Sequence, residues 1–239
     1  MNIIGIDCAT KQRKIGLALA SFQNGITTVR STKIGSETKP ALEIVKDWLV
    51  GAPSTVIALD APLGWPIELG INLLIHKAGE RIDVNPDMLF SRYTDREVWR
   101  RLHKKPFEVG ANLIARTSHA ALHLLGDLRQ ETGLAIPLAL NPDRITETCA
   151  IEVYPGATLQ AMGVKKEQRL SMIRDTDYLT MGLTSENLAS DHGLDAVVCV
   201  LSALDFLTGK CLMPTANEQK LAEKEGWIWV RSKEALPNY

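Results

Sequence analysis

Three aspartates stand where apolar segments of the sequence begin or end. The run NIIGID ends at Asp7, the run TVIALD ends at Asp60, and HGLDAVV places Asp195 at the start of a long apolar stretch. Carboxylates that come close together repel one another, and a cation that prefers oxygen ligands, such as Mg²⁺ or Mn²⁺, removes that repulsion. The three residues are therefore candidate metal ligands.

Other polar residues accompany these aspartates. Glu152, at the end of the β-rich run CAIEV, is a fourth candidate acid. Asp191 and His192 directly precede Asp195, and a carboxylate is favoured at the start of a helix. We take Asp191 as a candidate helix cap, and both residues as further candidates for the metal site.

The pattern of apolar and turn residues predicts the elements that bring these acids together. Asn-Gly at positions 24 and 25 is typical of a hairpin turn, because both residues tolerate positive φ. The predicted elements are strands over 2–7, 14–21, 27–34 and 55–60, with a helix over 40–49 before the last strand. A right-handed crossover through that helix places the last strand beside the first and parallel to it. Asp7 and Asp60 then share one edge of the sheet on strands about 4.8 Å apart, where open α/β sheets bind ligands.

The rest of the chain predicts further helices and strands of the same domain. We expect a helical insertion over about 65–145, a β-rich run before Pro155, a short amphipathic stretch over 165–174, a long helix over 193–207 and a last strand in EGWIWV. No repeat and no Pro/Gly/Ser-rich linker divides the sequence. A single domain over residues 1–239 is therefore expected.

One segment, SRYTDREVWRRLHKKP, is strongly basic. Four of its basic residues recur at a spacing of four, which places them on one face of a helix: Arg92, Arg96, Arg100 and Lys104. Val98, Trp99 and Leu102 mark the opposite, buried face. Such a run is usually a solvated surface, but a basic ridge facing the acids would also hold the phosphates of a substrate.

The bulk composition limits the partners of this protein. The formal net charge of −1 gives no overall attraction for nucleic acid or anionic membranes, so any basic surface must be local. No apolar run approaches the roughly 18 residues that span a bilayer, and no signal-peptide pattern opens the chain. The four cysteines form no CxxC pair, which favours a reducing, cytoplasmic location.

The motifs, in order, are GIDCA, IALDAPLG, TDR, EVYP, HGLDAVVCVLSA and EGWIW. This series resembles the family known as domain of unknown function 429, for which a ribonuclease-H-like fold is expected. HGLDAVV is also similar to the last catalytic helix of RuvC-type Holliday-junction resolvases. The resemblance covers nearly the whole chain. It implies a mixed sheet of strand order 3-2-1-4-5 flanked by helices.

The resemblance also implies an activity, that of a metal-dependent nuclease using two Mg²⁺ or Mn²⁺ ions. Asp7 matches the first-strand acid that bridges both ions, Asp60 the fourth-strand acid, and Asp195 the acid of the last helix. His192 matches the neighbour of that acid one turn earlier, and Glu152 matches the acid of the ExYP motif. The implied partner is nucleic acid or a nucleotide, and a homodimer is implied because resolvases of this type act as dimers.

Two other functions are compatible with this fold. One is a nucleic-acid-binding protein that has lost turnover. The other is a phosphotransferase like the actin and sugar-kinase ATPases, whose first phosphate loop resembles DCATKQRK. Such loops need closely spaced glycines, and the sequence contains neither GG nor GxG, which argues against the phosphotransferase.

Overall fold

The computed structural model describes residues 1–52, 54–110, 112–176, 179–182, 188 and 190–232. Its centre is a seven-stranded sheet of order β6-β3-β2-β1-β4-β5-β7. The strands are β1 (Asn2–Asp7), β2 (Gly16–Gln23), β3 (Ile26–Ile34), β4 (Thr55–Asp60), β5 (Cys149–Val153), β6 (Leu179–Met181) and β7 (Ile228–Trp229). The predicted mixed sheet of order 3-2-1-4-5 is confirmed. Two strands extend it, β6 at one edge, which was not predicted, and β7 at the other.

The directions of the central strands are also as predicted. β2 runs antiparallel to β1 and β3, whereas β4 runs parallel to β1. The turn between β2 and β3 has positive φ at both central residues, 53° at Asn24 and 78° at Gly25. That conformation matches the twist of the flanking strands, which explains the Asn-Gly pair.

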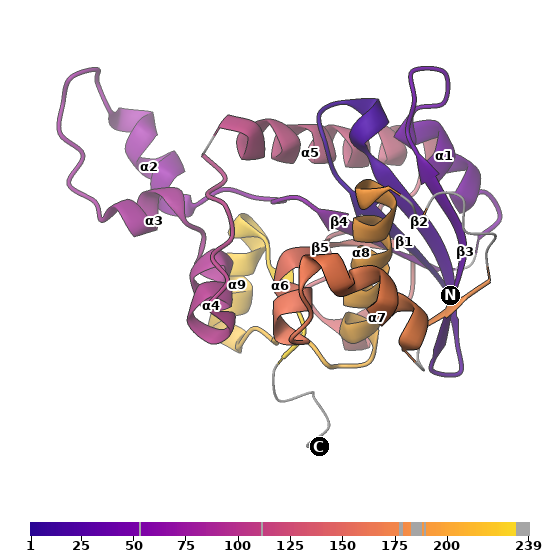
Figure 1. The fold of residues 1–239 in the computed structure, drawn as a ribbon. Coiled ribbons are helices and arrows are strands. Elements are labelled where there is room, and N and C mark those ends of the chain that lie inside the picture. The colour runs from indigo at the N-terminus through magenta and orange to yellow at the C-terminus, as the bar shows by residue number, and fades with distance from the viewer. Residues whose placement is uncertain (53, 111, 177–178, 183–187, 189, 233–239) are drawn as a thin grey trace.

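Helices cover both faces of the sheet (Figure 1). On one face α8 packs against a cluster that includes Ile3 and Val56, and on the other face α1 and α5 pack against Ile4 and Ile57. Neighbouring strand residues point to opposite faces, so a sheet covered on both sides requires continuous apolar runs.

The α-helices in the described residues are α1 (Ala41–Leu49), α2 (Ile67–Ile75), α3 (Pro86–Phe90), α4 (Tyr93–Leu102), α5 (Asn112–Thr132), α6 (Pro155–Ala161), α7 (Arg169–Asp175), α8 (Asp191–Leu207) and α9 (Ala216–Glu225). Short 3-10 turns lie at Gln12–Lys14, Pro142–Arg144 and Lys166–Gln168. Within the described ranges, no helix has both the length and the apolar composition needed to cross a bilayer.

The predicted insertion over 65–145 contains helices of two kinds. α2 and α3 extend away from the sheet (Figure 1), and α2 has no buried residue. α5, in contrast, contributes Ala121, Leu125 and Leu128 to the core beneath the sheet. α5 is therefore one of the layers of the domain, and of the helices before it α2 and α3 project from the sheet, whereas α4 packs against α6, α9 and β7.

Two glycines let α8 lie directly on the sheet. A β-carbon on Gly5 of β1 would overlap the backbone carbonyl oxygen of Ala196, and one on Gly16 of β2 would overlap that of His192. Both obstacles are backbone atoms, so no side-chain rotation would relieve them. The close approach brings the first two turns of α8, with His192 and Asp195, to the end of β1.

Replacing Gly16 with alanine should therefore lower the free energy of unfolding by about 1–3 kcal/mol, the cost typical of overpacking a core. Gly126→Ala is the matched control, because Gly126 lies in α5 with open space around its α-carbon. Alanine is favoured over glycine inside a helix by about 1 kcal/mol, so this variant should gain stability. Urea unfolding measures both changes, and a Gly16→Ala variant as stable as the parent would contradict the close-packing argument.

Candidate functional site

The predicted aspartates meet at one edge of the sheet. Asp7 and Asp60 are directly paired in the register of the parallel strands β1 and β4, each as the last residue of its strand. Asp195 lies in the second turn of α8, which packs across both strands. The meeting of Asp7 and Asp60 follows from the confirmed strand order, and α8 adds the third carboxylate.

The acids of this site are difficult to ionise together. Burial raises the pKa of Asp7 to about 6, with a smaller contribution from the charge of Asp195, although a hydrogen bond with His192 opposes the shift. Burial also raises the pKa of Asp60 well above its ordinary value, and the charges of Asp7 and Asp195 raise it further. The site therefore concentrates negative charge in a partly buried place, which is common at functional sites.

Basic groups already face two of the three aspartates. The Nδ1 atom of His192 lies 2.7 Å from Oδ2 of Asp7. Nε of Arg169 lies 3.2 Å from Oδ1 of Asp195, and Nζ of Lys166 lies 3.6 Å from its Oδ2. No ion pair of Asp60 is found in the described part of the chain, so its charge is offset least.

Asp191 has a different place from the predicted one. The cap of α8 is Ser190, whose hydroxyl accepts a hydrogen bond from the backbone N–H of Gly193. The Asp191 side chain is 74% exposed and pairs with Arg169 at 2.6 Å. The prediction that Asp191 caps the helix is therefore wrong, because the chain turns one residue earlier, and its carboxylate faces solvent.

The three aspartates suit a divalent cation by their chemistry. Carboxylate oxygens are the ligands that Mg²⁺ and Mn²⁺ prefer, and the raised pKa values of Asp7 and Asp60 reflect a repulsion that a cation would relieve. As the described side chains stand, no three His, Cys, Asp or Glu residues surround a common point suited to a metal ion. Ligation through Oδ2 of Asp7, or through either oxygen of Asp195, would require the cation to take the place of a basic partner.

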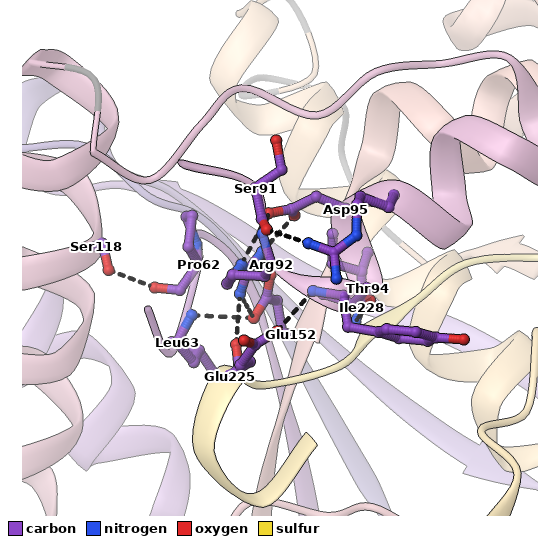
Figure 2. A network of polar contacts seen from close by, with 12 residues as sticks. Pro62, Leu63, Ser91, Arg92, Thr94, Asp95, Ser118, Glu152, Glu225 and Ile228 are labelled. Atoms are coloured by element: carbon purple, nitrogen blue, oxygen red, sulfur yellow. Dashed lines mark hydrogen bonds and ion pairs between the residues drawn. The ribbon is translucent and has the colours of Figure 1, made fainter. Parts of the chain in front are cut away.

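Glu152 is paired in the sheet with Leu59, the residue before Asp60, but its side chain is bound to other residues (Figure 2). Its side chain is 2% exposed, and its two carboxylate oxygens lie 2.6 and 2.8 Å from the Arg92 guanidinium. One of those oxygens also accepts the backbone N–H of Leu63 at 2.9 Å, in the loop that follows Asp60. With its oxygens engaged in this way, Glu152 positions the loop, and the catalytic role predicted for it stays a prediction.

Arg92 lies inside the protein and not on the exposed basic face that the spacing predicted. Its side chain is 1% exposed and bonds to Glu152, to Asp95 and to the backbone carbonyl of Glu225 (Figure 2). Burial alone would lower the pKa of Arg92, but the two carboxylates outweigh burial and raise it. Arg92 precedes α4 as its N-cap, where its side chain turns inward instead of continuing the helical face.

The other three residues of the predicted basic face, Arg96, Arg100 and Lys104, do not form one shared surface toward the site. Arg96 donates to the carbonyl oxygens of Ser91 and Asp87, and Arg100 pairs with Glu97 at 2.7 Å. Trp99, predicted to be buried, is 50% exposed. Lys104 alone of the four lines a cavity together with Asp60 and Asp195.

That cavity, of about 670 Å³, opens beside the carboxylates, and we call it the basic cavity for the three lysines on its walls, which one further acid, Glu167, accompanies. Its lining includes Lys104, Lys165, Lys166 and Tyr154. The residue pattern over Lys165–Arg174 predicted only an amphipathic stretch, and the place of its basic residues at the site was not predicted. The sequence signal that could have identified this basic wall was the Lys165-Lys166 pair with Arg169 after it. These residues follow the strand that carries Glu152, and they lie at the same end of the sheet as the aspartates.

Replacing Glu152 with glutamine should destabilise the fold by about 3–5 kcal/mol, because it leaves the buried Arg92 charge without a full partner. Asp47→Asn is the matched control, since it removes one carboxylate charge from an exposed pair with Lys39. An exposed pair contributes at most about 1 kcal/mol. Thermal unfolding of both variants tests this, and similar melting temperatures would mean that the buried pair adds no more than a surface one.

Comparison with solved structures gives a chain titled "T. thermophilus RuvC in complex with Holliday junction substrate". It is 14% identical, the match covers 87% of this chain and 96% of that chain, and the TM-score is 0.43. No curated protein sequence matches. The family model described as "Protein of unknown function (DUF429)" matches residues 5–219, and the chain therefore belongs to that family, as the motifs predicted.

Proposed function

We propose that this protein is a divalent-metal-dependent nuclease that hydrolyses phosphodiester bonds. The observation that carries the proposal is the pairing of Asp7 and Asp60 at the ends of adjacent parallel strands, with Asp195 close enough to raise the pKa of both. The cavity beside them has lysines on its walls. Acids that favour a cation and lysines that attract phosphate are the two parts that phosphodiester hydrolysis needs.

Asp7, Asp60 and Asp195 would hold the cation, Mg²⁺ or Mn²⁺. When bound, such ions activate water and stabilise the charge on the leaving oxygen. Water then attacks phosphorus in line, the bond from phosphorus to the leaving oxygen breaks, and that oxygen takes up a proton. His192 is the group suited to carry protons, since its imidazole bonds to Asp7 and its side chain is 40% exposed.

The basic residues would have two roles in turn. Before substrate binds, Lys166 and Arg169 offset the charge of Asp195. With a cation at Asp195, Lys166, which lines the cavity, would be available to a phosphate group of the substrate. Lys104 and Lys165 line the same cavity and would bind the neighbouring phosphates.

Replacing Asp7 with asparagine separates stability from activity. Addition of Mn²⁺ should raise the melting temperature of the parent, because an ion that binds only the folded state stabilises it by about 2.7 kcal/mol at a hundredfold excess over Kd. Asp7→Asn should lose most of this increase and all Mn²⁺-dependent cleavage. Melting curves with and without Mn²⁺ measure the first effect, and release of a labelled nucleic-acid fragment measures the second.

The metal-free proteins supply the control. The pKa of folded Asp7 is about 6, above the ordinary value of 3.8. Between these values the unfolded chain has lost the Asp7 proton and the folded chain keeps it, so the parent should lose stability relative to Asp7→Asn as pH rises through this range. Equal Mn²⁺ shifts in parent and variant would exclude Asp7 as a ligand. A metal-free variant far less stable than the parent at pH 7 would instead indicate a structural hydrogen-bond role.

Lys166→Ala should weaken nucleic-acid binding and improve Mn²⁺ binding, because the lysine contacts phosphate and competes with the cation for Asp195. The slope of log affinity against log salt for a single strand should fall by about 0.7, the value for one lost phosphate contact. Arg100→Ala is the matched control and should leave both quantities unchanged, since Arg100 pairs with Glu97 away from the cavity. If Arg100→Ala lowered the salt slope and Lys166→Ala did not, phosphate binding would be assigned to α4.

The alternative is a nucleic-acid-binding protein of the same fold without turnover. The ion pairs of Asp7 and Asp195 favour it, because they already neutralise part of the acidic charge. Nucleic-acid binding without Mn²⁺-induced stabilisation and without cleavage would support this alternative. The homodimer implied by the resemblance stays a prediction, which sedimentation of the purified protein would test.

A further inference from the structure

A second cavity lies on the other side of Asp60. It has a volume of about 260 Å³ and is formed by residues after β4, the connection between α4 and α5, the first turns of α5, and β5. Its apolar lining includes Pro62, Phe107, Ile114 and Tyr154. Asp60 and Tyr154 line both this cavity and the basic one, so the two cavities adjoin at the proposed catalytic carboxylate.

Two of the charged residues in the wall of this apolar cavity offset one another. Arg92 and Glu152 both contribute to its lining, but they are bonded to each other at 2.6 and 2.8 Å. The surface that they present is therefore close to neutral. A ligand group in this cavity would be recognised by shape and apolar contact, with Asp60, Thr117 and Tyr154 offering polar atoms at its edges.

The size of the apolar cavity and its aromatic residue restrict the ligand. Sites for drug-sized molecules occupy roughly 300–1,000 Å³, so a cavity of about 260 Å³ suits a single ring system. Phe107 lines the cavity although 72% of its surface is exposed. An aromatic side chain in this position can stack on a planar group that enters the cavity.

We propose that the apolar cavity binds the base of one unstacked nucleotide, whose phosphate lies in the basic cavity at Asp60. The inference rests on the proposed nuclease function and specifies its substrate class. A base within a duplex is stacked on both faces and cannot enter such a cavity unless it is flipped out of the helix. The substrate is therefore a nucleic acid with an unpaired nucleotide at the cleavage point, such as a single strand, a loop or an unpaired end.

The test compares three fluorescently labelled probes in Ca²⁺, by anisotropy. These are a twelve-nucleotide thymidine strand, the same backbone with abasic tetrahydrofuran units, and the thymidine strand paired with its complement. The parent should bind the thymidine strand roughly 5- to 150-fold more tightly than the abasic strand, the range expected for one stacked base. It should also prefer the single strand over the duplex.

Two variants locate the base. Phe107→Ala removes the stacking surface, and Ile114→Phe fills the cavity. Both should reduce the preference for thymidine over abasic strand, and both should keep the parent's affinity for the abasic strand and its Mn²⁺-induced rise in melting temperature. Phe90→Ala is the matched control, because Phe90 is also exposed, at 41%, but lies on α3. It should keep the full preference.

The outcomes separate this inference from the proposed function. Equal affinity of the parent for thymidine and abasic strands, or an unchanged preference in Phe107→Ala and Ile114→Phe, would overturn the base cavity even if Mn²⁺-dependent cleavage is observed. A base preference that both variants abolish, in a protein without cleavage or Mn²⁺ stabilisation, would uphold the cavity and overturn the nuclease. Binding of neither strand would overturn the base cavity as well.

Discussion

A buried guanidinium group holds together the segments that surround the site. Arg92 bonds to Glu152 at the end of β5 and to the backbone carbonyl of Glu225 at the end of α9, and Glu152 in turn holds the backbone N–H of Leu63. Leaving such a charge unpaired inside the protein would cost several kcal/mol. The loop after Asp60 therefore has one favourable position, and the wall of the apolar cavity forms from the same contacts that fix this loop.

The three carboxylates of the site repel one another, and the packing of the rest of the fold holds them together in spite of that repulsion. Gly5 and Gly16 admit α8 so closely that Asp195 must lie near Asp7, whose pKa burial raises. A protein selected only for stability would not retain this arrangement, since neutral side chains of the same shape would relieve the repulsion. The arrangement is understandable if the acids act together on something positively charged.

The sequence predicted most of the sheet and the meeting of Asp7 with Asp60, because both follow from local patterns and one handedness rule. β6 was missed because three residues at an edge carry no usable periodicity. Arg92 was placed on the wrong surface because its spacing fits a helix, whereas its partner Glu152 lies 60 residues away. The basic wall was missed for a similar reason, since no local pattern shows that Lys166 returns to the sheet edge. For Arg92 and for Lys166, contacts between segments far apart in the sequence determine where the side chain lies.

The Arg92 network also has a consequence for synthesis of the chain on the ribosome. Arg92 is separated from Glu152 by 60 positions and from Glu225 by 133. Strands β1 to β4 can pair while the later residues are still being translated, but the arginine lacks part of its hydrogen bonding until α9 has left the exit tunnel. The nascent protein would therefore carry paired aspartates on a partly built sheet before the wall beside them is fixed, and that wall would form only after α9 has emerged.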